Sequence, residues 1–352
     1  MSAKPVQVGV LGFAHGHVNS YCARWQKEQE LGVQVTAGWD ADAGRLAEAV
    51  QKFGIAPCAS AEELLSRGDV SAVVISAETS LHAELVEKAA AAGKAIIVQK
   101  PLALTMEEAD RIVDAVARSG VPFTLAWQMR VDPQNLEMKS LINDGTIGKV
   151  LMVRRRHGLS THTWAGFENS WHVSPKHNRD IWADDSSHPI DWMYWMFGMP
   201  VTVTAELASL VNPKIPNDNG IAIFRYGDGK IAEICCSFTC LAGENTVEII
   251  GDKGVIIQNY GDAPSANVPR PEGAVGLKWY LDATKQWTHS AHASPSNHGL
   301  RIAALAEPLA EFLHGRRPPI ANAVEGQDVL RLVLACYKAS DQGRRTRLFT
   351  RR

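Results

Sequence analysis

Residues 6–17 read VQVGVLGFAHGH, a short apolar strand followed by a turn that contains glycine. A second apolar segment, residues 33–39, ends at Asp40. A strand, a glycine turn, a helix and a second strand that ends in an acidic residue are typical of a dinucleotide-binding βαβ unit. The stretch therefore predicts a parallel sheet at the start of the chain, with a phosphate-binding turn at Gly12.

Apolar segments and amphipathic helical patterns alternate through the first part of the chain. Further strands are predicted at residues 70–76, 95–98 and 122–126, and helices at residues 17–29, 43–53, 81–92 and 106–119. Short apolar strands separated by amphipathic helices indicate a parallel sheet that is covered on both faces. We therefore predict an α/β Rossmann domain over residues 1–126.

The glycine turn matches the fingerprint Gly-x-Gly-x-x-Gly only at its first glycine, Gly12. Ala14 is small enough for a pyrophosphate to approach the backbone, whereas His17 stands in the place of the third glycine. The following helix supplies N–H groups and the positive end of its dipole. We expect Gly12, Phe13, Ala14 and His15 to bind a cofactor, although both histidines are equally compatible with solvent-facing loop positions.

Asp40 stands where an acidic residue holds the ribose diol of a dinucleotide. The next residues are Ala41 and Asp42, so that no Arg or Lys follows directly. A 2′-phosphate would meet two carboxylates at this point, and we therefore predict that the chain binds NAD in preference to NADP. Asp40 could instead be the N-cap of the following helix.

The second half of the chain carries the patterns of an antiparallel sheet. Residues 201–207 alternate as a half-buried strand does, residues 221–238 and 246–259 each form a predicted hairpin, and residues 300–313 and 324–340 are predicted helices. Antiparallel sheets are often covered on one face only. We therefore expect an α+β domain after the first one.

The composition excludes several classes of function. The 352 residues suffice for two domains, and the formal net charge of −2 gives no reason to expect binding to nucleic acid or to a membrane surface. No apolar run is long enough to span a bilayer, and the first residues enter a strand-like segment without a secretory signal. The six cysteines are scattered and form no Cys-x-x-Cys pair. We expect a cytoplasmic protein with reduced thiols.

Residues 184–192 read DDSSHPIDW and bring three carboxylates and a histidine together ahead of an apolar helix. Asp184 and His188 are one helical turn apart, so they would touch if the backbone is helical. A carboxylate beside an imidazole raises its basicity and fixes its tautomer, as proton transfer near neutral pH requires. The stretch also suits a plain helix start, with Pro189 at the first position and Asp191 in the first turn, so both interpretations stay open.

Several histidines precede this stretch and invite a metal interpretation together with Asp184. They are His157, His162, His172 and His177, followed by His188. Their spacings match no compact zinc motif. We therefore predict a site without a metal.

The fifth predicted strand runs into residues 96–103, which read IIVQKPLA. Together with the first turn and the Asp-x-x-x-His stretch, this segment resembles the glucose–fructose oxidoreductase / inositol dehydrogenase / MocA (Gfo/Idh/MocA) family. That family carries Glu-Lys-Pro at this strand end, and Gln99 replaces the glutamate here. Similar segments follow in the family's order at residues 74–82, 126–130 and 143–150, so that the resemblance covers nearly the whole chain.

The resemblance implies an NAD-dependent oxidoreductase that transfers a hydride between nicotinamide and a sugar, polyol or related cyclic alcohol. It implies that Lys100 hydrogen-bonds the reacting hydroxyl, that His188 takes or returns its proton, and that Asp184 orients this pair. Independently of the resemblance, Lys100 follows the carboxyl end of a parallel strand, where open α/β sheets bind ligands. The residues alone would equally fit an ordinary surface lysine.

Further roles follow from the same resemblance. The expected cofactor-binding residues include Ser76, His82, Gln99 and Lys100, and the expected substrate-binding residues are Lys100, Arg130, His172, Asp185 and His188. Residues 127–352 would form the substrate-binding α+β domain, with a large, mostly antiparallel, open-faced sheet and with its last helices returning toward the first domain. The open face would join two or four copies into a homodimer or homotetramer.

Two departures from the family pattern concern the chemistry. Residues 178–183 read NRDIWA where the family commonly has a glycine-rich run, and the glycines of the first turn are altered. Some relatives oxidise a sugar position only transiently so that elimination or hydrolysis can follow. The sequence therefore leaves a redox-neutral alternative open, in which a lyase or glycosidase retains its NAD.

Overall fold

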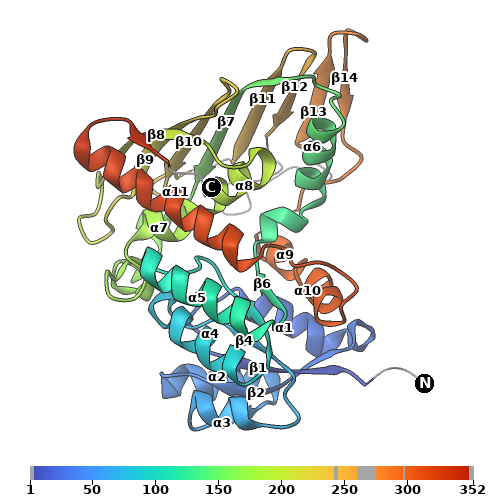
Figure 1. The fold of residues 1–352 in the computed structure, drawn as a ribbon, viewed down its shortest axis with the longest axis vertical. Helices are drawn as coiled ribbons and strands as arrows, with labels where there is room; N and C mark the ends of the chain where they lie inside the picture. The colour runs from blue at the N-terminus through green and yellow to red at the C-terminus, as the bar shows by residue number, and fades with distance from the viewer. Residues whose placement is uncertain (1–3, 242–244, 260–274, 296–297, 349–352) are drawn as a thin grey trace. The chain divides into compact units, whose positions relative to one another are not determined.

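The computed structural model describes residues 4–241, 245–259, 275–295 and 298–348 (Figure 1). The chain divides into two compact units. Unit 1 comprises residues 1–131, 176–178 and 302–330, and unit 2 comprises residues 132–175, 179–301 and 331–352. The segment 302–330 thus belongs with the N-terminal unit, although it follows the second sheet in sequence.

Unit 1 is built on a six-stranded sheet in the order β3-β2-β1-β4-β5-β6. Its strands are β1 (Val6–Leu11), β2 (Val33–Trp39), β3 (Ala56–Pro57), β4 (Ala72–Ile75), β5 (Ala95–Val98) and β6 (Phe123–Leu125). All neighbouring strands are parallel. Every residue of β4 is buried, and because successive side chains point to opposite faces, both faces of the sheet are covered. The Rossmann prediction is confirmed.

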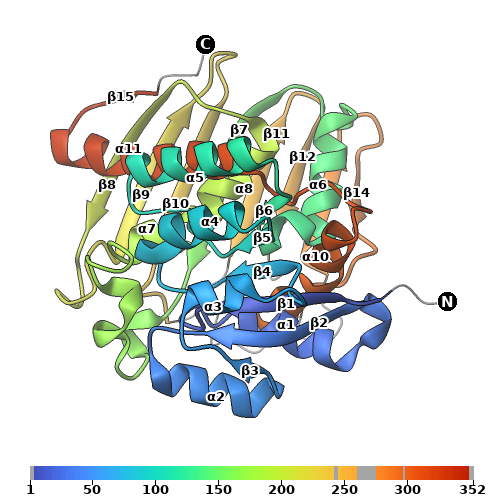
Figure 2. The same ribbon diagram turned by 60° about the horizontal axis from the view of Figure 1, so that its bottom comes forward.

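Among the described residues, six α-helices lie within unit 1. They are α1 (Val18–Lys27), α2 (Ala43–Phe53), α3 (Ala61–Ser66), α4 (His82–Ala91), α5 (Met106–Ser119) and α10 (Ala306–Leu313) (Figure 2). Of these, α2, α3 and α5 begin at an N-cap side chain that accepts a backbone hydrogen bond. The helix α5 starts with a capping box between Thr105 and Glu108, and it ends at Gly120 in the left-handed conformation. Four of these helices match the predicted ones, whereas α3 was not predicted because six residues are too short to show a helical period.

The helix predicted at residues 300–313 is interrupted. The structure has α9 (His298–Ala303) and α10, separated by a turn in which the Leu305 N–H donates to the Ile302 carbonyl. Leu305 is fully buried, so the apolar period continues across the break and the sequence pattern does not reveal it. The last predicted helix is confirmed as α11 (Ala323–Gln342).

Unit 2 is built on a nine-stranded sheet in the order β14-β13-β12-β11-β7-β10-β9-β8-β15. Its strands are β7 (Val150–Gly158), β8 (Thr202–Ala208), β9 (Asn219–Arg225), β10 (Ile231–Ser237), β11 (Thr246–Gly251), β12 (Gly254–Gln258), β13 (Leu277–Leu281), β14 (Gln286–His289) and β15 (Thr346–Arg347). Among the described strands of this sheet, only the pair β10–β7 is parallel. Both predicted hairpins, β9–β10 and β11–β12, are confirmed.

Among the described residues, helices cover one face of this second sheet and leave the other face uncovered. Unit 2 also contains α6 (Pro133–Asn143), α7 (Ile181–Asp185) and α8 (Ser187–Phe197), and α8 packs on β7 and β10 (Figure 1). On β9, Ala222 and Phe224 are fully buried, whereas Ile221 and Ile223 are 45% and 43% exposed. Because side chains alternate along a strand, the exposed pair marks the uncovered face.

Candidate active site

The turn after β1 is shaped around Gly12. Its φ of +86° lies in the left-handed region, and a Cβ at this position would lie 2.4 Å from the Cα of Ala77. The Gly12 N–H donates to the carbonyl of Trp39 at the end of β2 (2.7 Å). Only glycine fits both the conformation and the close approach. The altered fingerprint therefore keeps the glycine that the tight turn requires.

The same turn is fastened to the end of β4 on one side and is open on the other. The Ser76 hydroxyl donates to the His15 carbonyl (3.0 Å), and the His15 N–H donates to the Ser76 carbonyl (2.9 Å). The side chains of Phe13 and His15 are buried, whereas Ala14 is half-buried. A Cβ on the exposed Gly16 would meet nothing within 4 Å. The turn leads into α1, whose N-terminus is the kind of position at which a pyrophosphate binds.

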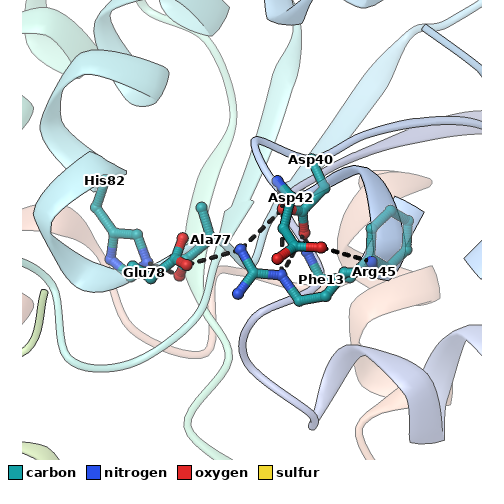
Figure 3. Close-up of polar contacts among 7 residues, drawn as sticks. All are labelled: Phe13, Asp40, Asp42, Arg45, Ala77, Glu78 and His82. Carbon is teal, nitrogen blue, oxygen red and sulfur yellow. Dashed lines mark hydrogen bonds and ion pairs between the residues drawn. The ribbon is translucent and has the colours of Figure 1, made fainter. Parts of the chain in front are cut away.

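Asp40 is buried at the end of β2 and accepts three kinds of hydrogen bond (Figure 3). Its side chain is 1% exposed. One oxygen accepts from the Phe13 N–H (2.7 Å), and the other accepts from the Asp42 N–H (2.7 Å) and from Arg45 Nη2 (2.8 Å). The N-cap of α2 is Asp42, whose side chain accepts from the Arg45 N–H. The N-cap interpretation of Asp40 is therefore wrong.

Arg45 places beside Asp40 a cation that the sequence pattern did not indicate. It lies in the first turn of α2 and folds back over Asp40, and its Nη2 also reaches Glu78 Oε1 (2.7 Å) in the loop after β4 (Figure 3). Burial opposes the charge of Arg45, but the hydrogen bonds to Asp40 and Glu78 outweigh it and raise the pKa of the guanidinium. A cation therefore stands beside the expected ribose site, although none follows Asp40 directly.

Lys100 lies two residues beyond β5, at the carboxyl edge of the parallel sheet. It is 2% exposed and is therefore no surface lysine. Gln99 is fully buried, and its amide donates to the Tyr21 hydroxyl on α1 (2.8 Å). Gln99 thus fixes the base of the loop that carries Lys100.

His82 was expected to bind the cofactor, and the structure places it beneath the two loops that would do so. Its imidazole is fully buried. Its Nδ1 lies 3.0 Å from the carbonyl of Pro101, and its Nε2 lies 3.2 Å from the carbonyl of Ala77. Burial lowers the pKa of His82 although backbone carbonyls surround it. The imidazole therefore joins the Lys100 loop to the loop after β4.

Arg130 was expected to contact substrate. Its side chain is 2% exposed, and its Nη1 pairs with Glu325 Oε1 (2.7 Å) and donates to the Ile320 carbonyl (3.2 Å). All three residues belong to unit 1. These contacts give Arg130 a structural role, in which it ties the start of α11 to the end of the Rossmann sheet.

In unit 2 the acidic stretch provides two neighbouring carboxylates, and each lies close to at least one imidazole. Asp184 Oδ2 lies 2.6 Å from His172 Nδ1. Asp185 Oδ2 lies 2.7 Å from His157 Nε2, and Asp185 Oδ1 lies 3.7 Å from His188 Nε2. Asp184, His157 and His188 are buried, and His172 is half-buried. The helical spacing pointed to Asp184 as the partner of His188, and it did not indicate the contacts of Asp185.

Three properties of the described residues bear on the remaining predictions. No group of three or more His, Cys, Asp or Glu side chains among them is arranged to hold a metal ion, and none of their helices is long and apolar enough to cross a membrane. All six cysteines are described, and each is a free thiol. Absence of a metal remains a prediction.

Comparison with known proteins identifies relatives over most of the chain. A profile described as an oxidoreductase family with an NAD-binding Rossmann fold matches residues 6–126, and the Gfo/Idh/MocA C-terminal domain matches residues 135–257. Inositol 2-dehydrogenase 2 of Saccharopolyspora erythraea is 33% identical over 70% of both chains. Inositol 2-dehydrogenase 3 of the same organism is 26% identical over 90% of this chain and 96% of its own. The structure of a levoglucosan dehydrogenase in complex with NADH and levoglucosan superposes with a TM-score of 0.84, at 19% identity, over 98% of this chain and 99% of its own.

Proposed function

Since the chain belongs to the Gfo/Idh/MocA family of oxidoreductases, we propose that it is an NAD-dependent dehydrogenase of a sugar, polyol or related cyclic alcohol. The observation that carries this proposal is the edge of the Rossmann sheet, where the Gly12 turn, buried Asp40 and buried Lys100 follow β1, β2 and β5. Relatives named scyllo-inositol 2-dehydrogenase (NAD⁺) from Bacillus subtilis and levoglucosan dehydrogenase from Pseudarthrobacter phenanthrenivorans support the substrate class. No observation favours the redox-neutral alternative.

The cofactor would be held by residues of unit 1. The main chain of residues 12–15 and the N-terminus of α1 would bind the pyrophosphate, and Asp40 would accept from the adenosine ribose. Ser76, His82 and Gln99 would fix the loops that surround it, as their contacts with His15, Ala77 and Tyr21 indicate. When bound, the nicotinamide accepts or donates the hydride.

Side chains of the protein would transfer the proton of the reacting hydroxyl. Lys100 would donate a hydrogen bond to the reacting oxygen and stabilise the alkoxide that forms as the hydride leaves. His188 would take the hydroxyl proton, and the nearby Asp185 carboxylate would favour the imidazolium. Asp184 would orient His172 toward the substrate's other hydroxyls. Arg130, whose Nη1 pairs with Glu325, would contact the substrate with another part of its guanidinium.

We propose NAD as the preferred cofactor over NADP. The carboxylates of Asp40 and Glu78 pair with the guanidinium of Arg45, and the Asp42 carboxylate accepts from the Arg45 backbone N–H, so three carboxylates lie near this arginine. A 2′-phosphate carries further negative charge and would be repelled by the excess of carboxylates. Measuring the dissociation constants of NADH and NADPH tests the preference, and tighter binding of NADPH contradicts it.

We further propose that the open face of the second sheet joins copies of the chain in the cytoplasm. Ile221 and Ile223 expose apolar area, and Arg154 lies within 4 Å of the carboxylates of Glu233 and Glu248 on the same sheet. The six free thiols fit a reducing compartment. Light scattering should give the mass of a dimer or tetramer for the unaltered protein. Ile223→Lys, which places a charge on the open face, should lower the measured mass. A monomer mass for the unaltered protein at micromolar concentration contradicts the assembly.

Lys100→Met tests the assigned chemistry most directly. It keeps the length and apolar stem of the side chain and removes its charge. We therefore expect kcat to fall by about 10²–10⁴-fold with any sugar or polyol that the unaltered enzyme oxidises. The dissociation constant of NADH should stay within about twofold, since Lys100 is assigned to the reacting oxygen. Lys338→Met alters an exposed lysine and serves as the control. Unchanged turnover of the Lys100 variant refutes the assignment.

Mass spectrometry of products from a sugar panel identifies the substrate.

A further inference from the structure

Arg45 stands where it could either bind the 2′-phosphate of NADP or pair with neighbouring carboxylates. Its Nη2 lies 2.8 Å from Asp40 Oδ1 and 2.7 Å from Glu78 Oε1, and its side chain is 29% exposed. Rossmann enzymes that take NADP use an arginine near the end of the second strand to bind the 2′-phosphate. Here such an arginine is present, but its guanidinium is held between two carboxylates from different loops (Figure 3).

The two carboxylates differ in what else they do. Asp40 accepts from the Phe13 and Asp42 N–H groups, so it keeps the β1 turn in place whatever Arg45 does. Glu78 precedes the 3-10 turn η2 (Thr79–Leu81), and its side chain does not cap that turn. The contact described for the Glu78 side chain is the ion pair with Arg45. With 11% of the side chain exposed, this pair is poorly screened by solvent.

We propose that Glu78 is a cofactor-specificity residue, which acts by holding Arg45 against Asp40 so that the guanidinium does not receive a 2′-phosphate. This inference rests on the proposed function, because it presumes that a nicotinamide dinucleotide binds at Asp40. Glu78 works in two ways. It occupies one edge of the guanidinium fork, and it adds a third carboxylate to the site where a phosphate of charge about −1.5 to −2 would have to enter.

The variant that isolates this role is Glu78→Gln. It keeps the shape of the side chain and removes its charge, so the guanidinium stays paired with Asp40 but is no longer held by a second carboxylate and can also contact the phosphate. We expect NADPH to bind about tenfold more tightly, the size of one charge-assisted hydrogen bond, with NADH unchanged within about twofold. In Glu78→Gln/Arg45→Met the gain should vanish, because the arginine carries it. Glu87→Gln breaks a more exposed ion pair of unit 1, that with Arg111, and should leave both affinities unchanged.

Arg45→Met alone provides a second measurement that does not depend on the folding of the Glu78 variant. Arg45→Lys, which keeps the positive charge and removes the guanidinium fork, is measured beside it, because Arg45→Met by itself also increases the repulsion from the carboxylates. If Glu78 keeps the guanidinium away from the phosphate, Arg45→Lys should leave the affinity for NADPH within about twofold of the unaltered protein. Selective weakening of NADPH binding by Arg45→Lys would mean that the guanidinium already binds the phosphate, and it would overturn the proposal.

The dissociation constants are measured by titration calorimetry on the full chain, with thermal unfolding as the check on folding. An unchanged ratio of NADPH to NADH affinity in Glu78→Gln, or a gain that persists without Arg45, overturns this inference and leaves the proposed function intact. If the unaltered protein binds neither dinucleotide, the proposed function fails as well. If the unaltered protein already prefers NADPH, the inference and the proposed NAD preference both fail.

Discussion

Gly12→Ala should destabilise the Rossmann unit through two separable effects. A side chain at a left-handed φ costs about 1–2 kcal/mol, and Gly12 has a φ of +86°. In addition, the new Cβ would lie 2.4 Å from Ala77 Cα and 2.5 Å from its N, which are backbone atoms that cannot rotate away. Overpacking of this kind costs about 1–3 kcal/mol. The sum is a loss of roughly 2–5 kcal/mol in the free energy of unfolding.

Gly54→Ala is the matched control for the first effect. Gly54 ends α2 with a φ of +65°, and a Cβ there would meet nothing within 4 Å. It should therefore cost only the conformational term of about 1–2 kcal/mol. The difference between the two variants measures the close approach between the β1 turn and the loop after β4.

Thermal unfolding followed by circular dichroism checks the prediction, since each 1 kcal/mol lowers Tm by about 2–4 °C in a domain of 150 residues or more. NADH affinity provides a second readout, because Gly12→Ala must displace Ala77 beside the expected cofactor site, whereas Gly54 lies at the far end of α2 from Asp42. If Gly12→Ala lowers Tm no more than Gly54→Ala does, the close approach is not what requires glycine, and the reasoning is refuted.

Three further predictions concern groups buried around the two sheets. Burial lowers the pKa of His82, so as the pH falls the unfolded chain takes up a proton at this residue more readily than the folded chain does. The unfolding temperature should therefore drop from pH 7 to pH 5. The drop should be smaller in His82→Gln, which has no imidazole to protonate. Arg301→Met should cost about 3–5 kcal/mol, because it strands Asp132 as a buried charge, and Asp132→Asn added to it should restore part of the loss in urea unfolding. Tyr337→Phe should cost about 1–3 kcal/mol, since it removes a hydrogen bond to the buried Asp180; a loss below 0.5 kcal/mol by the same measurement contradicts this role.

The alternation of strands and helices in unit 1 could be predicted because its signals are local. The strands β4 and β5 are short apolar runs, and α5 combines a capping box with a terminal glycine. The helix α6 shows where such signals fail. Asp132 and Pro133 mark its start, but two of its buried residues are polar, Gln134 and Asn135. Their partners, including the carbonyl of His292 and the indole of Trp192, lie more than 50 positions away in sequence. A hydrophobic period is therefore absent, although the helix is packed.

The cofactor site was predicted in outline, and its missing element was a cation. Asp40 could be predicted from its place at the end of β2. Arg45, in contrast, stands five positions later in sequence and does not directly follow the strand. The N-cap at Asp42 starts α2 in a direction that brings the first-turn side chain of Arg45 back over the strand end. Glu78 joins it from another loop. Spacing alone does not disclose such a return, because it depends on where the helix begins and how it turns.

The acidic stretch in unit 2 illustrates the same limit for the proposed proton chemistry. Spacing by four predicts a contact between Asp184 and His188 but says nothing about Asp185: neighbouring helical residues point about 100° apart, so two successive carboxylates face different surroundings. Asp184 contacts His172 in the 3-10 turn η6 (Trp171–Val173), and Asp185 contacts His157 on β7. Because Asp185 also lies 3.7 Å from His188, its charge would help to stabilise a proton there, and it joins that imidazole to a second one buried in the sheet. The pairing of carboxylates with histidines is thus determined by the strand and turn that surround α7, which lie outside the motif itself.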